Sequence, residues 1–256
     1  MESTAADVYG GNLMEGKFTR PLTVPLSRCD DTGRLSLVGA LAEFMDMATL
    51  HAEMIGVGGA AMAQKHLFWL TVRTRIRFYQ RPAMLQTVDL TTWPGAIDGM
   101  RCARYYTMTR GDKMLAEAKT QWAVFDTEVK RPVPVAPVFP PDVILPDDTV
   151  CGGSAFAHLR EVPEETVCTY TVRSVDLDIG GHMNNVAYIP MLLGTLSSQE
   201  LHPIRELETV YRRPCLEGET LSIRRQRSEN GWAFAAVKAD GEVAVLSRAL
   251  ECFSAD

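Results

Sequence analysis

Stretches in which apolar and polar residues alternate fill much of the chain and predict a protein rich in antiparallel β-strands. The main stretches are residues 22–26, 85–92, 100–109, 114–125, 167–175, 220–225, 232–238 and 244–253. Glycine-containing turns at residues 110–112 and 239–241 join neighbouring strands as hairpins. Residues 37–54 and 185–196 are apolar over longer stretches and predict two helices, although Pro190 should kink or interrupt the second helix.

The order of these elements repeats once along the chain. Residues 77–83 match residues 209–215 without a gap, and the turn at residues 31–35 aligns with the turn at residues 178–182. Each half therefore consists of a strand, a turn, a helix and a meander of long strands. A helix wrapped by a curved antiparallel sheet, used twice, is an α+β fold. In this alignment Leu35, which cannot move a proton, stands opposite His182, so we expect the second copy to be the reactive one.

A proline-rich segment separates the two halves. Residues 131–153 contain six prolines, which exclude a central strand or a helix and indicate an extended, semi-rigid connector. The predicted organisation is a first unit at residues 1–130, a linker at residues 131–163 and a second unit at residues 164–256.

Composition narrows the class of protein. The 256 residues are 46% hydrophobic and 23% charged, as in ordinary globular proteins, and the net charge of −6 argues against a general role in nucleic-acid binding. No apolar run approaches the roughly 18–20 residues of a membrane span, and the first residues do not resemble a signal peptide. Six scattered cysteines without a Cys-x-x-Cys pair predict reduced thiols, a cytoplasmic location and no structural zinc.

Groups that can carry out chemistry are concentrated in residues 176–188. Asp178 and His182 lie four residues apart on a turn that contains two glycines, and Asn184 is suited to cap the helix that follows. Such an arrangement can orient the imidazole, activate water and aim backbone N–H groups at an oxyanion. The alternative is an aspartate that only stabilises the turn and a histidine that only binds backbone carbonyls.

Two motifs and their order resemble those of a known family. Residues 176–189 are similar to the signature Asp-x-Asn-x-His-x-Asn-Asn-x-x-Tyr-Ile, and residues 211–215 to Tyr-Arg-Arg-x-Cys, both of the acyl-acyl-carrier-protein thioesterases. In the first half, residues 33–36, His51, Trp69, Arg73 and residues 92–94 also match, although we expect His51 to be a packed core residue. The resemblance implies a tandem double hotdog in which the first unit shapes an acyl pocket and the second carries catalysis. It also implies hydrolysis of fatty acyl-acyl carrier protein to free fatty acid and carrier, with no metal or organic cofactor.

The resemblance and the turn together suggest roles for individual residues. Asp178 and His182 are expected to activate or deliver the attacking oxygen. The residues expected to bind substrate and oxyanion are Gly180, Gly181 and Asn184. Cys215 aligns with the cysteine of the family signature and is a candidate nucleophile, although a buried cysteine is more often a small packing residue. Direct attack by Asp178 through a mixed anhydride is a third route.

Two positions depart from the family pattern. Gly180 stands where the family has Asn, and Val210 stands where plant-type members have Glu. Glu208, two residues earlier, would point to the same face of its strand and could substitute, but we expect it to be a solvated surface acid. These departures keep a non-catalytic acyl-binding protein open as an alternative, beside a thioesterase for coenzyme A conjugates.

Arginines cluster along the predicted strands despite the net acidity. Such runs are usually solvated strand faces, but a positive patch would steer the approach of a small acidic carrier protein. The residues predicted to dock acyl carrier protein are Arg212, Arg213 and Arg224. The predicted partners are therefore the carrier and its fatty acyl thioester, without nucleic acid or a membrane span. Two fused units are compatible with either a monomer or a homodimer.

Overall fold

The computed structural model describes residues 10–153 and 155–253, which fall into two compact units. Unit 1 is drawn from Met1–Val72 and Phe78–Ala155, and unit 2 from Arg73–Arg77 and Phe156–Asp256. No helix in the described part of the chain is both long and apolar enough to cross a membrane.

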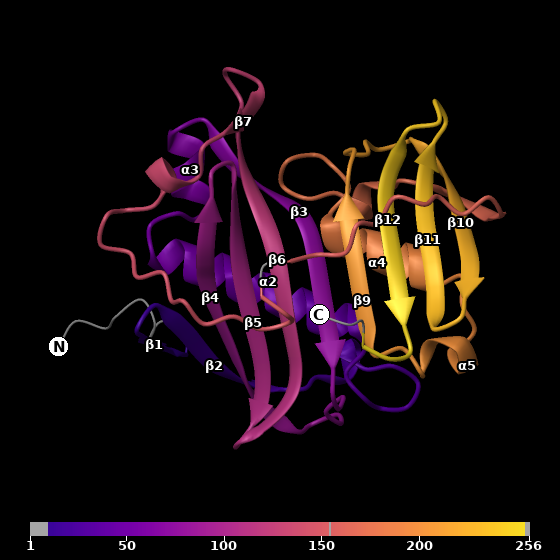
Figure 1. Ribbon diagram of the computed structural model, residues 1–256, viewed down its shortest axis with the longest axis horizontal. Helices are drawn as coiled ribbons and strands as arrows, with labels where there is room; N and C mark the ends of the chain where they lie inside the picture. Colours follow the sequence, from indigo (N-terminus) through magenta and orange to yellow (C-terminus); the bar gives the residue numbers. More distant parts are fainter. Residues whose placement is uncertain (1–9, 154, 254–256) are drawn as a thin grey trace. The chain divides into compact units, whose positions relative to one another are not determined.

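Unit 1 is an antiparallel sheet with one long helix, α2 (Leu37–Met54), across one face (Figure 1). The strands are, in spatial order, β1 (Asn12–Met14), β2 (Lys17–Thr23), β4 (Thr87–Asp98), β5 (Arg101–Arg110) and β6 (Lys113–Asp126), with β7 (Arg131–Val133) paired to β6. The short helices are η1 (Leu26–Arg28), α3 (Gly59–Gln64) and η2 (Ala136–Val138). The predicted bounds of the long helix are confirmed, because Ser36 Oγ caps it by accepting from the Gly39 N–H at 2.9 Å.

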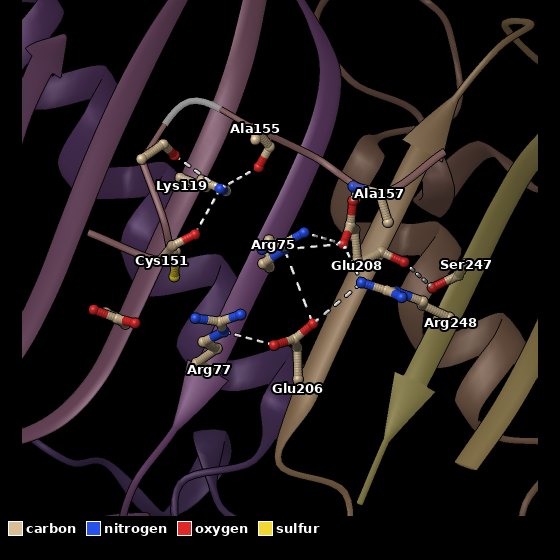
Figure 2. A network of polar contacts seen from close by, with 12 residues as sticks. Arg75, Arg77, Lys119, Cys151, Ala155, Ala157, Glu206, Glu208, Ser247 and Arg248 are labelled. Atoms are coloured by element: carbon tan, nitrogen blue, oxygen red, sulfur yellow. Dashed lines mark hydrogen bonds and ion pairs between the residues drawn. The ribbon is translucent and has the colours of Figure 1, made fainter. Parts of the chain in front are cut away.

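The two faces of the unit 1 sheet have different coverings. On the helix side, Phe44 packs against Tyr106 with ring centroids 5.3 Å apart. On the other side, the Trp93 indole N–H donates to the carbonyl of Asp148 at 2.8 Å. The ammonium of Lys119, which is fully buried, donates to three carbonyls of residues 151–155 (Figure 2). The segment after the prolines is therefore bound to the sheet face that the helix leaves uncovered.

Unit 2 has the same plan. Part of β3 (Leu67–Phe78) is followed in the sheet by β9 (Glu206–Tyr211), β12 (Val243–Leu250), β11 (Gly231–Lys238), β10 (Thr220–Ser228) and β8 (Thr166–Thr171). Helix α4 (Asn185–Leu193) crosses behind these strands in Figure 1, and the short helices are η3 (Ser174–Asp176) and α5 (Ser198–Leu201). On the opposite face, Leu159 and Val162 pack against Leu246 and its neighbours.

Several elements of unit 2 differ in their bounds from the prediction, and β12 for example ends at Leu250 rather than at residue 253. The strand expected at residues 167–175 ends at Thr171, because Asp176 Oδ2 accepts from the Arg173 N–H at 2.8 Å and turns the chain into η3. The helix expected at residues 185–196 ends at Leu193. It runs through Pro190, so the helix is not interrupted there, and a kink at the proline stays a prediction.

Candidate active site

The predicted site lies in a tight turn of unit 2, directly before α4. The Asp178 N–H donates to the His182 carbonyl at 2.8 Å, and the Gly181 N–H donates to the Asp178 carbonyl at 3.0 Å. Leu177 and Met183 form a β-bridge just outside these bonds. Gly181 has a φ of +73°, a left-handed conformation that favours glycine. The turn therefore brings Asp178 and His182 side by side at its two ends.

Gly180 leaves open a space that both side chains border. A Cβ atom on Gly180 would lie 3.1 Å from Asp178 Oδ1 and 3.7 Å from His182 Nδ1. Asp178 Oδ1 accepts from the N–H groups of Gly180 at 2.8 Å and of His182 at 3.4 Å. Asp178 Oδ2 and the His182 imidazole have no hydrogen-bond or ion-pair partner among the residues that the structure describes. Because Gly180 has no side chain, the space between the Asp178 carboxylate and the His182 ring is not filled by a Cβ atom.

Unit 1 contains the same turn, but its polar groups are already paired. The Asp30 N–H donates to the Arg34 carbonyl at 2.8 Å, and Asp30 Oδ1 accepts from the N–H groups of Thr32 at 3.0 Å and Arg34 at 3.4 Å. Here the Thr32 hydroxyl also donates to Oδ1 at 2.6 Å, and Arg81 forms an ion pair with Oδ2. Burial tends to raise the pKa of Asp30, but the Thr32 hydrogen bonds and the Arg81 charge outweigh it and lower the pKa. Both carboxylate oxygens of Asp30 are thus bonded within unit 1 and stabilise the turn.

The hydrogen bonds shift the alignment of the two turns by one residue. The N–H groups of Leu35 and Met183 make equivalent bonds to the chain beyond the following strand. The counterpart of His182 is therefore Arg34, and the prediction that Leu35 stands opposite His182 is wrong. Gly33, the left-handed glycine of the unit 1 turn, corresponds to Gly181 in unit 2, which is also left-handed. The alignment by residue type had matched Gly33 to Gly180. The counterpart of the histidine still cannot act as a proton shuttle, because it is an arginine.

Asn184 caps helix α4, as predicted. Its Oδ1 accepts from the Val186 N–H at 2.9 Å. The Tyr211 hydroxyl donates to the Asn185 carbonyl at 3.1 Å, and Tyr188 packs edge-on against the Tyr211 ring with centroids 5.9 Å apart. These contacts hold the helix start, with the positive end of its dipole, directly beside the turn.

Cys215 is fully buried. Burial raises the pKa of the thiol, although a hydrogen bond with the Tyr188 hydroxyl acts in the opposite direction. A raised pKa disfavours the thiolate, which is the nucleophilic form. The Cys215 carbonyl accepts from the Met183 N–H at 2.8 Å, and the corresponding carbonyl in unit 1 belongs to Pro82, so the alignment of Cys215 with Ala83 is wrong by one residue. These observations favour a packing role for Cys215.

The three arginines predicted to dock a carrier do not form one patch. Arg212 Nη2 donates to the Leu159 carbonyl at 2.8 Å, and Arg213 pairs with Glu242 at 3.1 Å. Arg224 lies on β10, and β12 and β11 separate it from β9, a distance of about 14 Å at the usual strand spacing. Arg212 and Arg213 are exposed neighbours, whereas Arg224 is half-buried and separate from them.

A buried network of charged side chains was missed by the sequence analysis (Figure 2). Its members are Arg75, Arg77, Glu206, Glu208 and Arg248. Glu208 Oε2 accepts from Arg75 Nη2 at 2.8 Å and from Arg248 Nη2 at 3.0 Å, while its Oε1 accepts from the Ala157 N–H at 2.8 Å. Glu206 accepts from Arg77 Nε at 2.6 Å. Arg75 and Arg77 of β3 are therefore paired inside the protein rather than presented on a solvated strand face.

Glu208 is fully buried, so the expectation of a solvated surface acid is wrong. The available signal was the register of two strands, in which Arg75 lies opposite Glu208 and Arg77 lies opposite Glu206. Among the described residues, the Glu208 carboxylate bonds to Arg75, Arg248 and the Ala157 N–H. These partners do not include Asp178 or His182.

Comparison with protein families gives two matches along the chain. The model of the acyl-ACP thioesterase N-terminal domain matches residues 15–140, and that of the C-terminal domain matches residues 159–246. The oleoyl-acyl carrier protein thioesterase of Coriandrum sativum is 26% identical over 212 residues, which are 73% of this chain and 57% of the relative. The dodecanoyl-[acyl-carrier-protein] hydrolase of Cinnamomum camphora is 25% identical over 204 residues, or 70% of this chain and 51% of the relative. The chain thus spans about half the length of these curated relatives.

Solved structures with the same fold cover nearly the whole chain. An acyl-ACP thioesterase from Bacteroides thetaiotaomicron has a TM-score of 0.84 at 22% identity, over 93% of this chain and 99% of that chain. The 12:0-ACP thioesterase from Umbellularia californica has a TM-score of 0.79 at 19% identity, over 93% and 98% of the two chains. At these identities the likeness establishes the fold, a large antiparallel sheet with few helices.

Proposed function

The chain belongs to the acyl-ACP thioesterase family, and from this premise we propose that it hydrolyses a fatty acyl thioester on acyl carrier protein. The products are a free fatty acid and the carrier thiol. We assign the fold in detail as a tandem double hotdog, with unit 1 shaping the acyl pocket and unit 2 carrying the reaction. A cytoplasmic location and a monomer or homodimer remain predictions.

The observation that carries this proposal is the difference between the two equivalent turns. In unit 1 the Thr32 hydroxyl and the Arg81 guanidinium bond to the two carboxylate oxygens of Asp30. In unit 2 Asp178 Oδ2 and the His182 imidazole have no partner in the described chain. A turn that was only structural would gain from the closed arrangement of the first copy. The open arrangement leaves a carboxylate oxygen and an imidazole of one turn unpaired, and such a pair is suited to orient and deprotonate a water molecule.

In the proposed reaction, the His182 imidazole accepts a proton from a water molecule that Asp178 Oδ2 orients. The water oxygen attacks the thioester carbon, and the carbonyl oxygen becomes an oxyanion beside the positive end of α4. The C–S bond then breaks, and the imidazolium returns the proton to the departing sulfur. The Val186 N–H is taken by the Asn184 cap, so we assign the Asn185 N–H, one position earlier, as the helix donor to the oxyanion.

Hydrolysis of the same acyl chain on two carriers tests the proposal. We expect acyl-acyl carrier protein to be hydrolysed faster than the coenzyme A thioester, and His182→Ala to lower kcat on both by about 100-fold or more, the range of general acid–base catalysis. Arg34→Ala, which changes the equivalent position of unit 1, should leave kcat near wild type. Near-normal turnover by His182→Ala would show that this turn is not the active site. A bound fatty acyl ligand that is retained and not hydrolysed by wild type would indicate a non-catalytic binding protein.

A further inference from the structure

A positively charged side chain is buried inside unit 1 without an anion. Arg104 lies on β5, on the sheet face that α2 covers, and is 6% exposed. Its Nη1 bonds to His51 Nδ1 at 3.0 Å and to Thr92 Oγ1 at 3.4 Å. These two contacts are its only hydrogen bonds among the described residues, and none of its described contacts is with a carboxylate.

The two buried arginines of unit 2 show what is missing at this position. Arg75 and Arg77, which are equally inaccessible, each contact a glutamate at less than 3 Å. A buried guanidinium without an anion is strongly destabilising, because the lost hydration is not replaced by an opposite charge. Burial accordingly lowers the pKa of Arg104. A carboxylate from outside the chain would supply the missing charge.

His51 adds a second donor that has no acceptor. Burial, and then the charge of Arg104, lower the pKa of His51 to about 3, so the ring is neutral near pH 7. Its Nδ1 accepts from the arginine, which leaves the proton on Nε2. Nε2 is buried and has no hydrogen-bond partner in the described chain. Apart from the Nη1 bonds to His51 and Thr92, the N–H groups of the pair have no acceptor among the described residues.

The other titratable groups beside Arg104 cannot provide the negative charge. Burial raises the pKa of both the Tyr106 hydroxyl and the Cys102 thiol to about 12, so both are neutral. The Tyr106 hydroxyl already shares a hydrogen bond with the Thr120 hydroxyl at 3.0 Å. The His51 ring also has an apolar neighbour, because Phe18 stacks on it with centroids 6.1 Å apart. A ligand that binds the free N–H groups of Arg104 and His51 must therefore supply an acceptor oxygen, and an apolar remainder would suit the Phe18 ring.

We propose that Arg104 and His51 bind a carboxylate carried on an acyl chain at the end away from the thioester. This inference rests on the proposed function, in which unit 1 holds the acyl chain. An inorganic anion would make no use of the neighbouring Phe18 ring, whereas a linear diacid linked through one end as a thioester brings methylene groups to it. The preferred substrate class is then the half-thioester of a linear diacid rather than a plain fatty acyl chain.

A substrate ratio tests this inference. For wild type, kcat/KM should be higher for the half-thioesters of some linear diacids than for plain acyl chains of the same length on the same carrier. Arg104→Met should reverse that preference by about tenfold or more, the effect of losing a hydrogen bond to a charged group. Arg101→Met removes a neighbouring exposed arginine that bonds to Gln121 and should leave the ratio unchanged. Arg104→Gln, which keeps N–H donors without the charge, should fall between the two.

A purely structural arginine predicts a different result. In that case Arg104→Met changes the midpoint of thermal unfolding but not the substrate ratio, and this outcome would overturn the inference. A binding measurement separates it from the proposed function, because it needs no hydrolysis. Monomethyl esters of linear diacids should bind wild type at least about tenfold more tightly than the corresponding plain methyl esters, and Arg104→Met should abolish the difference. Equal binding of the two esters would overturn the carboxylate site even if plain thioesters are hydrolysed. If the difference is observed and no thioester is hydrolysed, the proposed function fails and the binding site stands.

Discussion

Asp30 and Asp178 accept the same two backbone N–H bonds in their turns, yet only Asp30 has an arginine on its second carboxylate oxygen. Identical backbone geometry therefore supports two different roles. In unit 1 the paired carboxylate can only hold the chain, whereas in unit 2 one oxygen holds the turn and the other has no partner among the described residues. The neighbours of each aspartate, rather than the aspartate itself, determine whether it can take part in a reaction.

The buried thiol of Cys215 permits a sharp test at the same scale. Because burial raises its pKa, we predict that Cys215→Ala keeps kcat within about threefold of wild type. Its stability should fall by about 1 kcal/mol, since the Tyr188 hydroxyl loses a partner. Steady-state kinetics and urea unfolding measure the two effects. A fall in kcat of several orders of magnitude would instead identify the thiol as the nucleophile.

His51 should make the protein sensitive to acid. Its pKa is about 3 in the folded state, below the usual 6.5, so the unfolded chain binds a proton that the folded protein does not. The stability of wild type should therefore fall as the pH drops from about 6.5 towards 3, by about 1.4 kcal/mol per pH unit from this residue. His51→Gln should flatten that slope in urea unfolding, whereas replacing the exposed His66 with Gln should not. Parallel slopes for wild type and His51→Gln would contradict the assignment.

Strands β3 and β9 are joined by opposite charges as well as by backbone bonds. We predict that Glu208→Ala lowers the free energy of unfolding by about 3–5 kcal/mol, because Arg75 and Arg248 lose their buried partner. Glu242→Ala breaks the exposed pair with Arg213 and should cost less than about 1 kcal/mol. Urea unfolding of both variants provides the comparison. Equal effects would mean that the buried network adds no stability of its own.

Local patterns predicted some elements well and others poorly. The bounds of α2 follow from a continuous apolar stretch behind a capping serine, both of which are visible in the sequence. The end of β8 depends on a side chain that binds the backbone three residues away, so a strand-like composition continued past it. The alignment of the two turns failed for a similar reason. Its register depends on which glycine is left-handed, and that is a property of the folded backbone.

The candidate site was predictable where its parts are adjacent in the chain. Asp178, His182 and the Asn184 cap lie within seven residues, and their order alone indicated a reactive turn. The buried partners of Glu208 lie far along the chain, with Arg75 133 residues away, so its environment depended on strand pairing. The lack of a carboxylate beside Arg104 could not be predicted either, because it depends on which side chains the fold places around the guanidinium.

At the scale of the whole molecule, one plan is used twice with different outcomes. Both units have an N-capped helix against an antiparallel sheet and a turn held by the same hydrogen bonds. In the account proposed here, unit 1 has its turn closed by an ion pair and retains a buried cation for the acyl chain. Unit 2 has its turn open for hydrolysis.

Paired substitution of the two equivalent aspartates tests this division most directly. Asparagine keeps an oxygen for the backbone N–H groups, so Asp178→Asn and Asp30→Asn should both preserve their turns. We expect the initial rate of acyl-acyl carrier protein hydrolysis to fall about 100-fold or more in Asp178→Asn and to stay near wild type in Asp30→Asn. Equal rates in the two variants, with both proteins folded, would contradict it.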